Sequence, residues 1–97
     1  MTVWFVSRHA GAVEWARRQG LSVDRLVDHL DPAEVEAGDV VAGTLPIHLA
    51  AEVCERGARY LHLRLEVPRE LRGRELTADD LAALGARLEA YQVRRCP

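Results

Sequence analysis

Short apolar runs and amphipathic stretches alternate along this chain of 97 residues. Apolar runs that stop at polar residues or glycine are typical of buried strands, whereas apolar positions three and four residues apart are typical of helices. The pattern predicts strands at Val3–Ser7, Arg25–His29, Val40–Thr44 and Tyr60–Val67, and helices at Gly11–Gln19, at Leu45–Arg56 and from Thr77 to the end of the chain.

Three of these segments need further argument. Val23–Leu30 fits a helix or a strand, and a strand is expected because a parallel sheet needs one after the first helix. Tyr60–Val67 alternates strictly between apolar and polar residues, which indicates an edge strand or a strand whose other face meets a partner. The last helix is expected to be long, because apolar residues recur at helical spacing at Leu81, Leu84, Leu88 and Tyr91.

Capping residues and glycines support these boundaries. Gly20 and Gly57 are expected to end the first two helices, and Thr77 with the acidic residues after it opens the last. Asp31–Glu34 predicts a single capped turn with a proline at its first position. Pro68–Glu75 predicts a polar loop that carries three arginines.

The order of strands and helices predicts the fold. Strands that alternate with helices form a mostly parallel sheet, joined by right-handed crossovers. We therefore expect an α/β protein with one Rossmann-like domain over residues 1–97, in which helices flank a sheet of four or more strands.

Composition narrows the function classes. The hydrophobic fraction is 48%, which suits a packed globule, and the net charge of −2 argues against a general binder of polymeric DNA or RNA. No stretch is long and apolar enough for a membrane span, and no signal peptide is visible, so a cytoplasmic protein is expected. Cys54 and Cys96 have no CxxC spacing and are expected to be reduced thiols.

Candidate chemistry lies first where the opening strand meets the first helix. Ser7, Arg8 and His9 follow the apolar run directly, at the carboxyl end of a strand, where open α/β sheets bind ligands. Arginine supplies a positive fork, histidine a titratable ring, and the helix N-terminus free N–H groups. The combination suits a phosphate.

The second candidate junction is Gly43–His48. Thr44 ends the third strand and His48 lies in the first or second turn of the next helix. Because parallel strands end at the same edge, we expect Arg8, His9, Thr44 and His48 to share one pocket, with two helix N-termini pointing into it.

Plainer interpretations exist for each of these residues. Ser7 and Thr44 suit helix caps, and Arg8 suits a surface ion pair with Glu14 or a terminal carboxylate. His48 and Glu52 are four residues apart on one helix, but no further ligand accompanies them, so no metal site is expected. The arginines of Pro68–Glu75 suit a solvated loop, or a lid over an anionic ligand.

Blocks of this sequence resemble a family of small, single-domain accessory proteins of type III CRISPR systems. The most specific blocks are Ser7-Arg8-His9 after the first strand, Gly43-Thr44-Leu45-Pro46 and Ala58–Leu63, and the likeness covers nearly the whole chain. The resemblance implies a protein related to CRISPR-associated Rossmann-fold sensor domains that handles cyclic oligoadenylates. It implies ring-nuclease activity on cyclic tetra-adenylate.

This implied activity assigns roles to the candidate residues. A two-fold homodimer would surround the ring, Arg8 would hold a phosphate, and Ser7 and the backbone around Ala10, Gly11, Thr44 and Leu45 would complete its cradle. The ribose 2′-OH would attack its own phosphate, with His9 or His48 as general base or acid. That chemistry needs no metal and no cofactor.

Three other functions remain open. The same pocket would serve a protein that sequesters the messenger without cleaving it. The second alternative is a histidine phosphatase, because a strand followed by Arg-His is the first signature of that superfamily. Here, however, Arg8-His9 is followed by Ala10 rather than glycine, and the chain is short for that fold. The third alternative is an interaction module in which the polar residues at the strand ends are helix caps.

Overall fold

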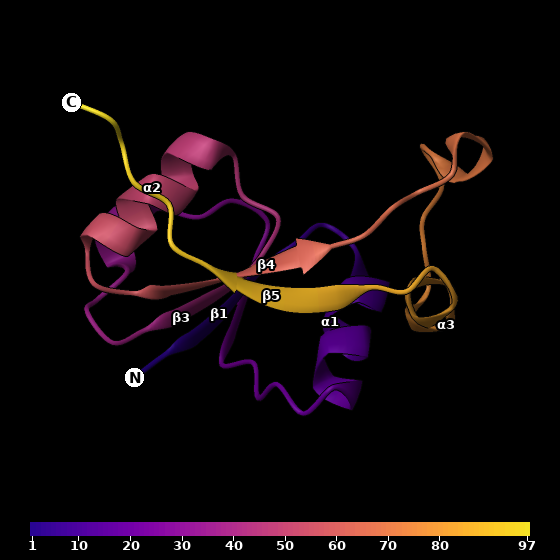
Figure 1. The fold of residues 1–97 in the computed structure, drawn as a ribbon. Helices are drawn as coiled ribbons and strands as arrows, with labels where there is room; N and C mark the ends of the chain where they lie inside the picture. Colours follow the sequence, from indigo (N-terminus) through magenta and orange to yellow (C-terminus); the bar gives the residue numbers. More distant parts are fainter.

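A computed structural model describes all of residues 1–97. Five strands form one sheet in the order β2-β1-β3-β4-β5, accompanied by three α-helices and two short 3₁₀ helices, η1 and η2 (Figure 1). Along the chain the elements are β1 Val3–Val6, α1 Ala10–Arg18, β2 Arg25–Val27, η1 Pro32–Glu34, β3 Val40–Gly43, α2 Ile47–Glu55, β4 Arg59–Arg64, η2 Arg69–Leu71, α3 Ala78–Ala83 and β5 Arg87–Tyr91.

The sheet separates two hydrophobic cores. On one side α1 and α3 pack around Phe5, Trp15 and Leu81, and on the other side α2 and η1 pack around Trp4, Val53 and their neighbours. Trp4 and Phe5 are adjacent in β1 and face opposite cores because side chains alternate along a strand. The protein is therefore a three-layer α/β domain, and α1 and α2 lie on opposite sides of the sheet (Figure 1). None of the helices has the length and apolar character that a membrane crossing requires.

The expected Rossmann-like arrangement is confirmed. Strands β1 to β4 are parallel, and β2 and β3 both pair with β1, one on each side. The chain thus changes direction across the sheet between β1 and β3. Open α/β sheets bind ligands beyond the carboxyl ends of the strands at such a switch point. The order places that point at the end of β1 and the end of β3.

The prediction for the C-terminal segment was wrong. Helix α3 ends at Ala83, and the chain then forms β5, which pairs antiparallel with β4 from Tyr60↔Tyr91 to Arg64↔Arg87. Gly85, with a φ of +73°, lies in the turn between α3 and β5. Consequently β4 lies inside the sheet, and of the two alternatives for Tyr60–Val67 the edge strand was wrong.

A buried carboxylate ties the amino ends of β1 and β3 together. Asp39 is 4% exposed and accepts hydrogen bonds from the backbone N–H of Thr2 at 2.9 Å, from that of Glu36 at 3.0 Å, and from Nε1 of Trp4 at 3.2 Å. The hydrogen bonds from Glu36 and Thr2 lower the pKa of Asp39, because they favour the charged form.

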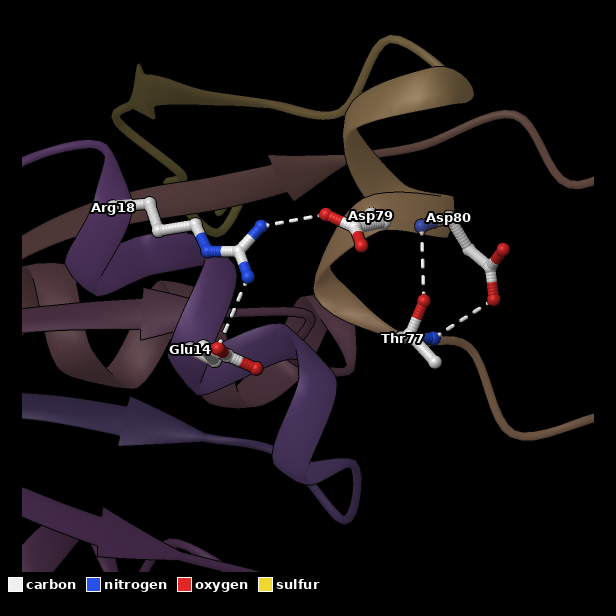
Figure 2. A network of polar contacts seen from close by, with 5 residues as sticks. All are labelled: Glu14, Arg18, Thr77, Asp79 and Asp80. Carbon is white, nitrogen blue, oxygen red and sulfur yellow. Dashed lines mark hydrogen bonds and ion pairs between the residues drawn. The ribbon is translucent and has the colours of Figure 1, made fainter.

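Exposed polar contacts join α3 to α1 (Figure 2). Arg18 of α1 donates to Asp79 at 2.7 Å and to Glu14 at 3.1 Å. At the start of α3, Thr77 and Asp80 form the expected cap in both directions, each side chain accepting from the other's backbone N–H. These contacts fix where the segment between β4 and α3 rejoins the domain.

Candidate functional site

A cavity of about 680 Å³ opens at the carboxyl edge of the sheet, on the side covered by α1 and α3. Its walls come from the strand ends, the start of α1, and the segment between β4 and α3. The lining residues are Val6, Ser7, Arg8, His9, Ala12, Asp28, Thr44, Leu63, Leu65, Val67, Leu71, Arg72, Gly73, Arg74, Leu76 and Leu81.

The junction of β1 and α1 presents an uncapped helix end to this cavity. His9 is the N-cap residue of α1, and no side chain accepts a hydrogen bond from the first turn. Ser7 does not cap α1, because its Oγ instead accepts from the backbone N–H of His9 at 3.0 Å. The N–H of Ala12 donates to the carbonyl oxygen of His9 at 3.1 Å, which leaves the N–H groups of Ala10 and Gly11 without a partner within the helix. Such a helix end suits an anion.

Arg8 extends from the same junction and is exposed. Its Nη2 lies 3.4 Å from Nε2 of His29, and it forms no ion pair with a carboxylate. The alternative in which Arg8 pairs with Glu14 was wrong, since Glu14 binds Arg18 instead. The guanidinium of Arg8 is therefore free to hold a negatively charged ligand.

The junction of β3 and α2 contributes less than expected. Thr44 lines the cavity, but its Oγ1 donates to the carbonyl oxygen of Leu63 at 3.4 Å and does not cap α2, whose N-cap residue is Pro46. Leu45 is buried in the core beneath α2, and its N–H donates to the Tyr60 hydroxyl at 3.1 Å. That N–H is thus already satisfied within the chain.

The Tyr60 hydroxyl holds this second junction in place. It lies 3.3 Å from the carbonyl oxygen of Gly43 and 2.7 Å from Nδ1 of His62, besides accepting from Leu45. Burial raises the pKa of Tyr60, which keeps the hydroxyl protonated and able to donate. Tyr60 therefore positions the chain on either side of Thr44.

The structure does not bring His48 into the cavity. His48 is exposed on α2, which covers the sheet face opposite to the cavity. The expected convergence of two helix N-termini fails for the same reason, because α1 and α2 leave the strand ends toward different faces. Of the four residues expected to share one pocket, Arg8, His9 and Thr44 line it.

Ala10 and Gly11 also lie outside the cavity lining, and Gly11 has a steric role. A Cβ at Gly11 would overlap the carbonyl oxygen of Leu76 and lie 2.9 Å from the Cα of Thr77. The glycine thus lets the segment that leads into α3 cross directly over the first turn of α1.

The rest of the wall was not predicted from the sequence. Half of the lining residues are hydrophobic, and many of these follow β4. The strict alternation of Leu63, Leu65 and Val67 was a usable signal, since it marks one continuous apolar face. Arg72 and Arg74 line the cavity from the loop for which a lid was one of two interpretations, while Arg69 does not.

The cavity is rich in cationic groups. Three arginines line it, against a single carboxylate from Asp28. No group of three or more His, Cys, Asp or Glu side chains is arranged to hold a metal ion. A phosphate-bearing ligand with an apolar or planar part matches this combination of arginines, helix end and leucine wall.

Comparison with known proteins identifies a family. Residues 4–94 match the family model described as "Putative CRISPR-associated protein (Cas_VVA1548)". No curated protein and no solved structure matches the chain. Because the match covers nearly all of the sequence, the chain belongs to this CRISPR-associated family.

Proposed function

We propose that this protein binds a cyclic oligoadenylate, with cyclic tetra-adenylate as the expected ring, and cleaves it without a metal ion. The observation that carries the proposal is the cavity itself. At the switch point of the sheet it combines Arg8, His9 and the uncapped end of α1 with an apolar wall. Membership in a CRISPR-associated family supports a role in antiviral defence, and the proposed role is to switch off type III signalling.

The polar side of the cavity fits a phosphodiester. Arg8 offers two parallel N–H donors to the phosphate oxygens, and the N-terminus of α1 adds the positive end of the helix dipole beside them. A phosphodiester gains negative charge in the transition state of its cleavage, so these donors would stabilise the transition state more than the bound ring.

The apolar side fits a base. Leu63 and Leu65 form part of a wall that free phosphate would leave in contact with water. An adenine ring placed on this wall would bury that surface. The wall therefore favours a nucleotide over an inorganic anion as the ligand.

Cleavage would use a nucleophile that the ring itself carries. The ribose 2′-oxygen attacks the adjacent phosphorus, the bond to the 5′-oxygen breaks, and the product ends in a 2′,3′-cyclic phosphate. His9 is the histidine in the cavity lining and would take the proton from the 2′-OH or give one to the departing 5′-oxygen. Arg8 would hold the phosphate in line for the attack.

A homodimer is part of the proposal. A ring with two-fold symmetry presents the same chemistry on two sides, and a two-fold dimer would place one cavity against each. The ring, rather than polymeric nucleic acid or a membrane, is the proposed partner, consistent with the net charge of −2.

The test is incubation of the purified protein with radiolabelled cyclic tetra-adenylate in EDTA, followed by separation of the products. Linear di-adenylate with a cyclic phosphate end is expected. We expect Arg8→Ala and His9→Ala to abolish it and His48→Ala, outside the cavity, to leave it unchanged. Loss of activity in His48→Ala alone would refute the assignment to this cavity.

A second function is favoured by one observation. The cavity lining contains one histidine and one carboxylate, so the base and the acid that the two oxygens of the phosphodiester call for would have to come from His9 and Asp28 alone. A protein that binds the ring and releases it intact would sequester the messenger. Bound, uncleaved ring after prolonged incubation would support this function, and an absence of binding would leave the interaction module as the better explanation.

A further inference from the structure

We infer that Arg72 and Arg74 form a second phosphate-binding position in the cavity and select ligands that carry at least two phosphodiesters. The inference rests on the proposed function and deepens it. Arg8 provides the first position, at the end of β1, whereas Arg72 and Arg74 come from the segment between β4 and α3.

The position of this segment is the first support. It extends beyond the carboxyl end of β4, where the parallel strands of the sheet end (Figure 1). After η2 the chain turns at Gly73, whose φ is +82°, and the residues on both sides of this glycine line the cavity. Arg69, in η2 itself, does not line it. The loop therefore places two of its three arginines in the lining of the ligand site.

The charge pattern is the second support. None of the five ion pairs in the chain involves Arg8, Arg72 or Arg74. Glu70 and Glu75, which belong to the same segment, are absent from the cavity lining. Three arginines thus line one space together with a single carboxylate-bearing residue, Asp28. Outside the lining, Asp80 offsets part of this charge, since hydrogen bonds with Thr77 and, after them, the charge of Arg74 lower the pKa of Asp80. Like charges gathered in this way repel one another, and an anionic ligand would relieve the repulsion.

The segment is also anchored beside the site. Its last residue, Leu76, crosses the first turn of α1 at Gly11, and the mutual cap of Thr77 and Asp80 starts α3 immediately afterwards. The arginines are therefore carried on a chain that is fixed at β4 and at α1. Such an anchor lowers the entropy that a freely moving loop would lose on binding.

The chemistry of guanidinium groups explains the selectivity. One arginine fork matches one phosphate, so Arg8 and the helix end already suffice for a mononucleotide. Two further arginines on a separate wall add contacts only if the ligand carries a second phosphate at a distance from the first. A cyclic oligonucleotide satisfies this condition and a mononucleotide does not.

The experiment compares affinities for cyclic tetra-adenylate and for AMP in four proteins. These are the wild type, Arg8→Ala, the double variant Arg72→Ala/Arg74→Ala, and the matched control Arg69→Ala from the same loop. For the double variant we expect affinity for the ring to fall about tenfold or more for each arginine, whereas affinity for AMP stays unchanged. Arg69→Ala should bind both as the wild type does.

The salt dependence and a conservative variant provide further readouts. Loss of phosphate contacts should make binding of the ring less sensitive to salt in the double variant than in the wild type. Arg72→Lys/Arg74→Lys keeps the charge but loses the fork and should bind with intermediate affinity. Unchanged circular dichroism and urea midpoints would show that the variants remain folded.

Each result separates this inference from the proposed function. If Arg8→Ala loses the ring but the double variant binds it like the wild type, the second phosphate position is refuted and the proposed function stands. If the wild type does not bind the ring, the proposed function fails, and NMR titration with pyrophosphate decides the inference. Shifts of the side-chain Nε–H signals of Arg72 and Arg74, without a shift for Arg69, would support it, and their absence would overturn it.

Discussion

Gly11→Ala tests how closely the arginine-bearing segment packs on α1. Gly11 lies in the first turn of a helix, where alanine would ordinarily stabilise a protein by about 0.5–1 kcal/mol. In this fold, however, the added Cβ would overlap the carbonyl oxygen of Leu76. It would also lie 2.9 Å from the C and Cα atoms of Thr77, about 0.5 Å inside the 3.4 Å at which ordinary contact begins.

The atoms that the new methyl group meets are backbone, so no rotamer change relieves the overlap. Either α1 or the chain at Leu76 and Thr77 must move, and forced overpacking of this kind costs about 1–3 kcal/mol. When the gain in helix propensity is subtracted from this cost of overpacking, we expect Gly11→Ala to lower the free energy of unfolding by roughly 0.5–2 kcal/mol. Urea denaturation followed by circular dichroism measures this difference.

The same substitution should also weaken ligand binding, because the displaced chain carries Arg72 and Arg74. Arg17→Ala, at an exposed position of the same helix, is the control and should change stability by no more than about 0.5 kcal/mol. A Gly11→Ala protein that is more stable than the wild type and binds cyclic tetra-adenylate equally well would refute the close packing of Leu76 on α1.

Three further substitutions test polar contacts that hold the fold together. Asp39→Asn should cost on the order of 1.5–3 kcal/mol at neutral pH. Because folding lowers the pKa of Asp39, this stabilisation is present above the unfolded pKa of about 3.9 and is lost as the pH falls through the folded pKa. The free energies of unfolding of wild type and variant, measured by urea denaturation, should therefore converge in acid. A difference between them that stays constant with pH would contradict the role of the Asp39 carboxylate. Tyr60→Phe leaves the buried N–H of Leu45 without its acceptor and should lower the free energy of unfolding, measured by urea denaturation, by about 1–3 kcal/mol. An unchanged free energy of unfolding would contradict this hydrogen bond. Thr77→Ala removes the cap of α3 and should lower the free energy of unfolding by about 1 kcal/mol in urea denaturation. Thr77→Ser keeps the capping hydroxyl and should retain most of the stability of the wild type.

The elements that the sequence predicts well are those whose signal is local. An apolar run that stops at Ser7 and the helical pattern after it place the first junction within a residue or two, because strand and helix periods differ clearly there. The capped turn at η1 follows from the same local chemistry, since Asp31 accepts from the N–H of Ala33 as its position before proline indicates.

The C-terminal strand could not be predicted in this way. Leu84, Leu88 and Tyr91 lie at helical spacing, and Arg87–Tyr91 consists mostly of residues that favour helices. What decides the outcome is tertiary structure. Gly85 permits the turn, and β4 offers an open edge on which Leu88 joins the core beneath α1 and α3.

The placement of His48 shows a second limit. Sequence order indicates that two strand ends share an edge of the sheet, but it does not indicate toward which face the chain leaves each end. Leu45 is buried in the core beneath α2 with Ala50 and Val53, and His48 lies on that helix, away from the cavity. The face that each helix covers depends on the direction of the crossover, which only the assembled sheet defines.

The candidate site therefore has two parts with different origins. The strand ends supply Arg8, His9 and Thr44 at positions fixed by the register of β1 and β3, and such positions follow from the fold class. The segment between β4 and α3 supplies Arg72, Arg74 and much of the leucine wall, and its path depends on one close backbone contact at Gly11. A Rossmann-like edge alone would bind many phosphates, so any preference for a ring must come from the second part. Substitutions at the strand end should therefore abolish binding of every phosphate ligand, whereas substitutions in the segment should change which ligand is preferred.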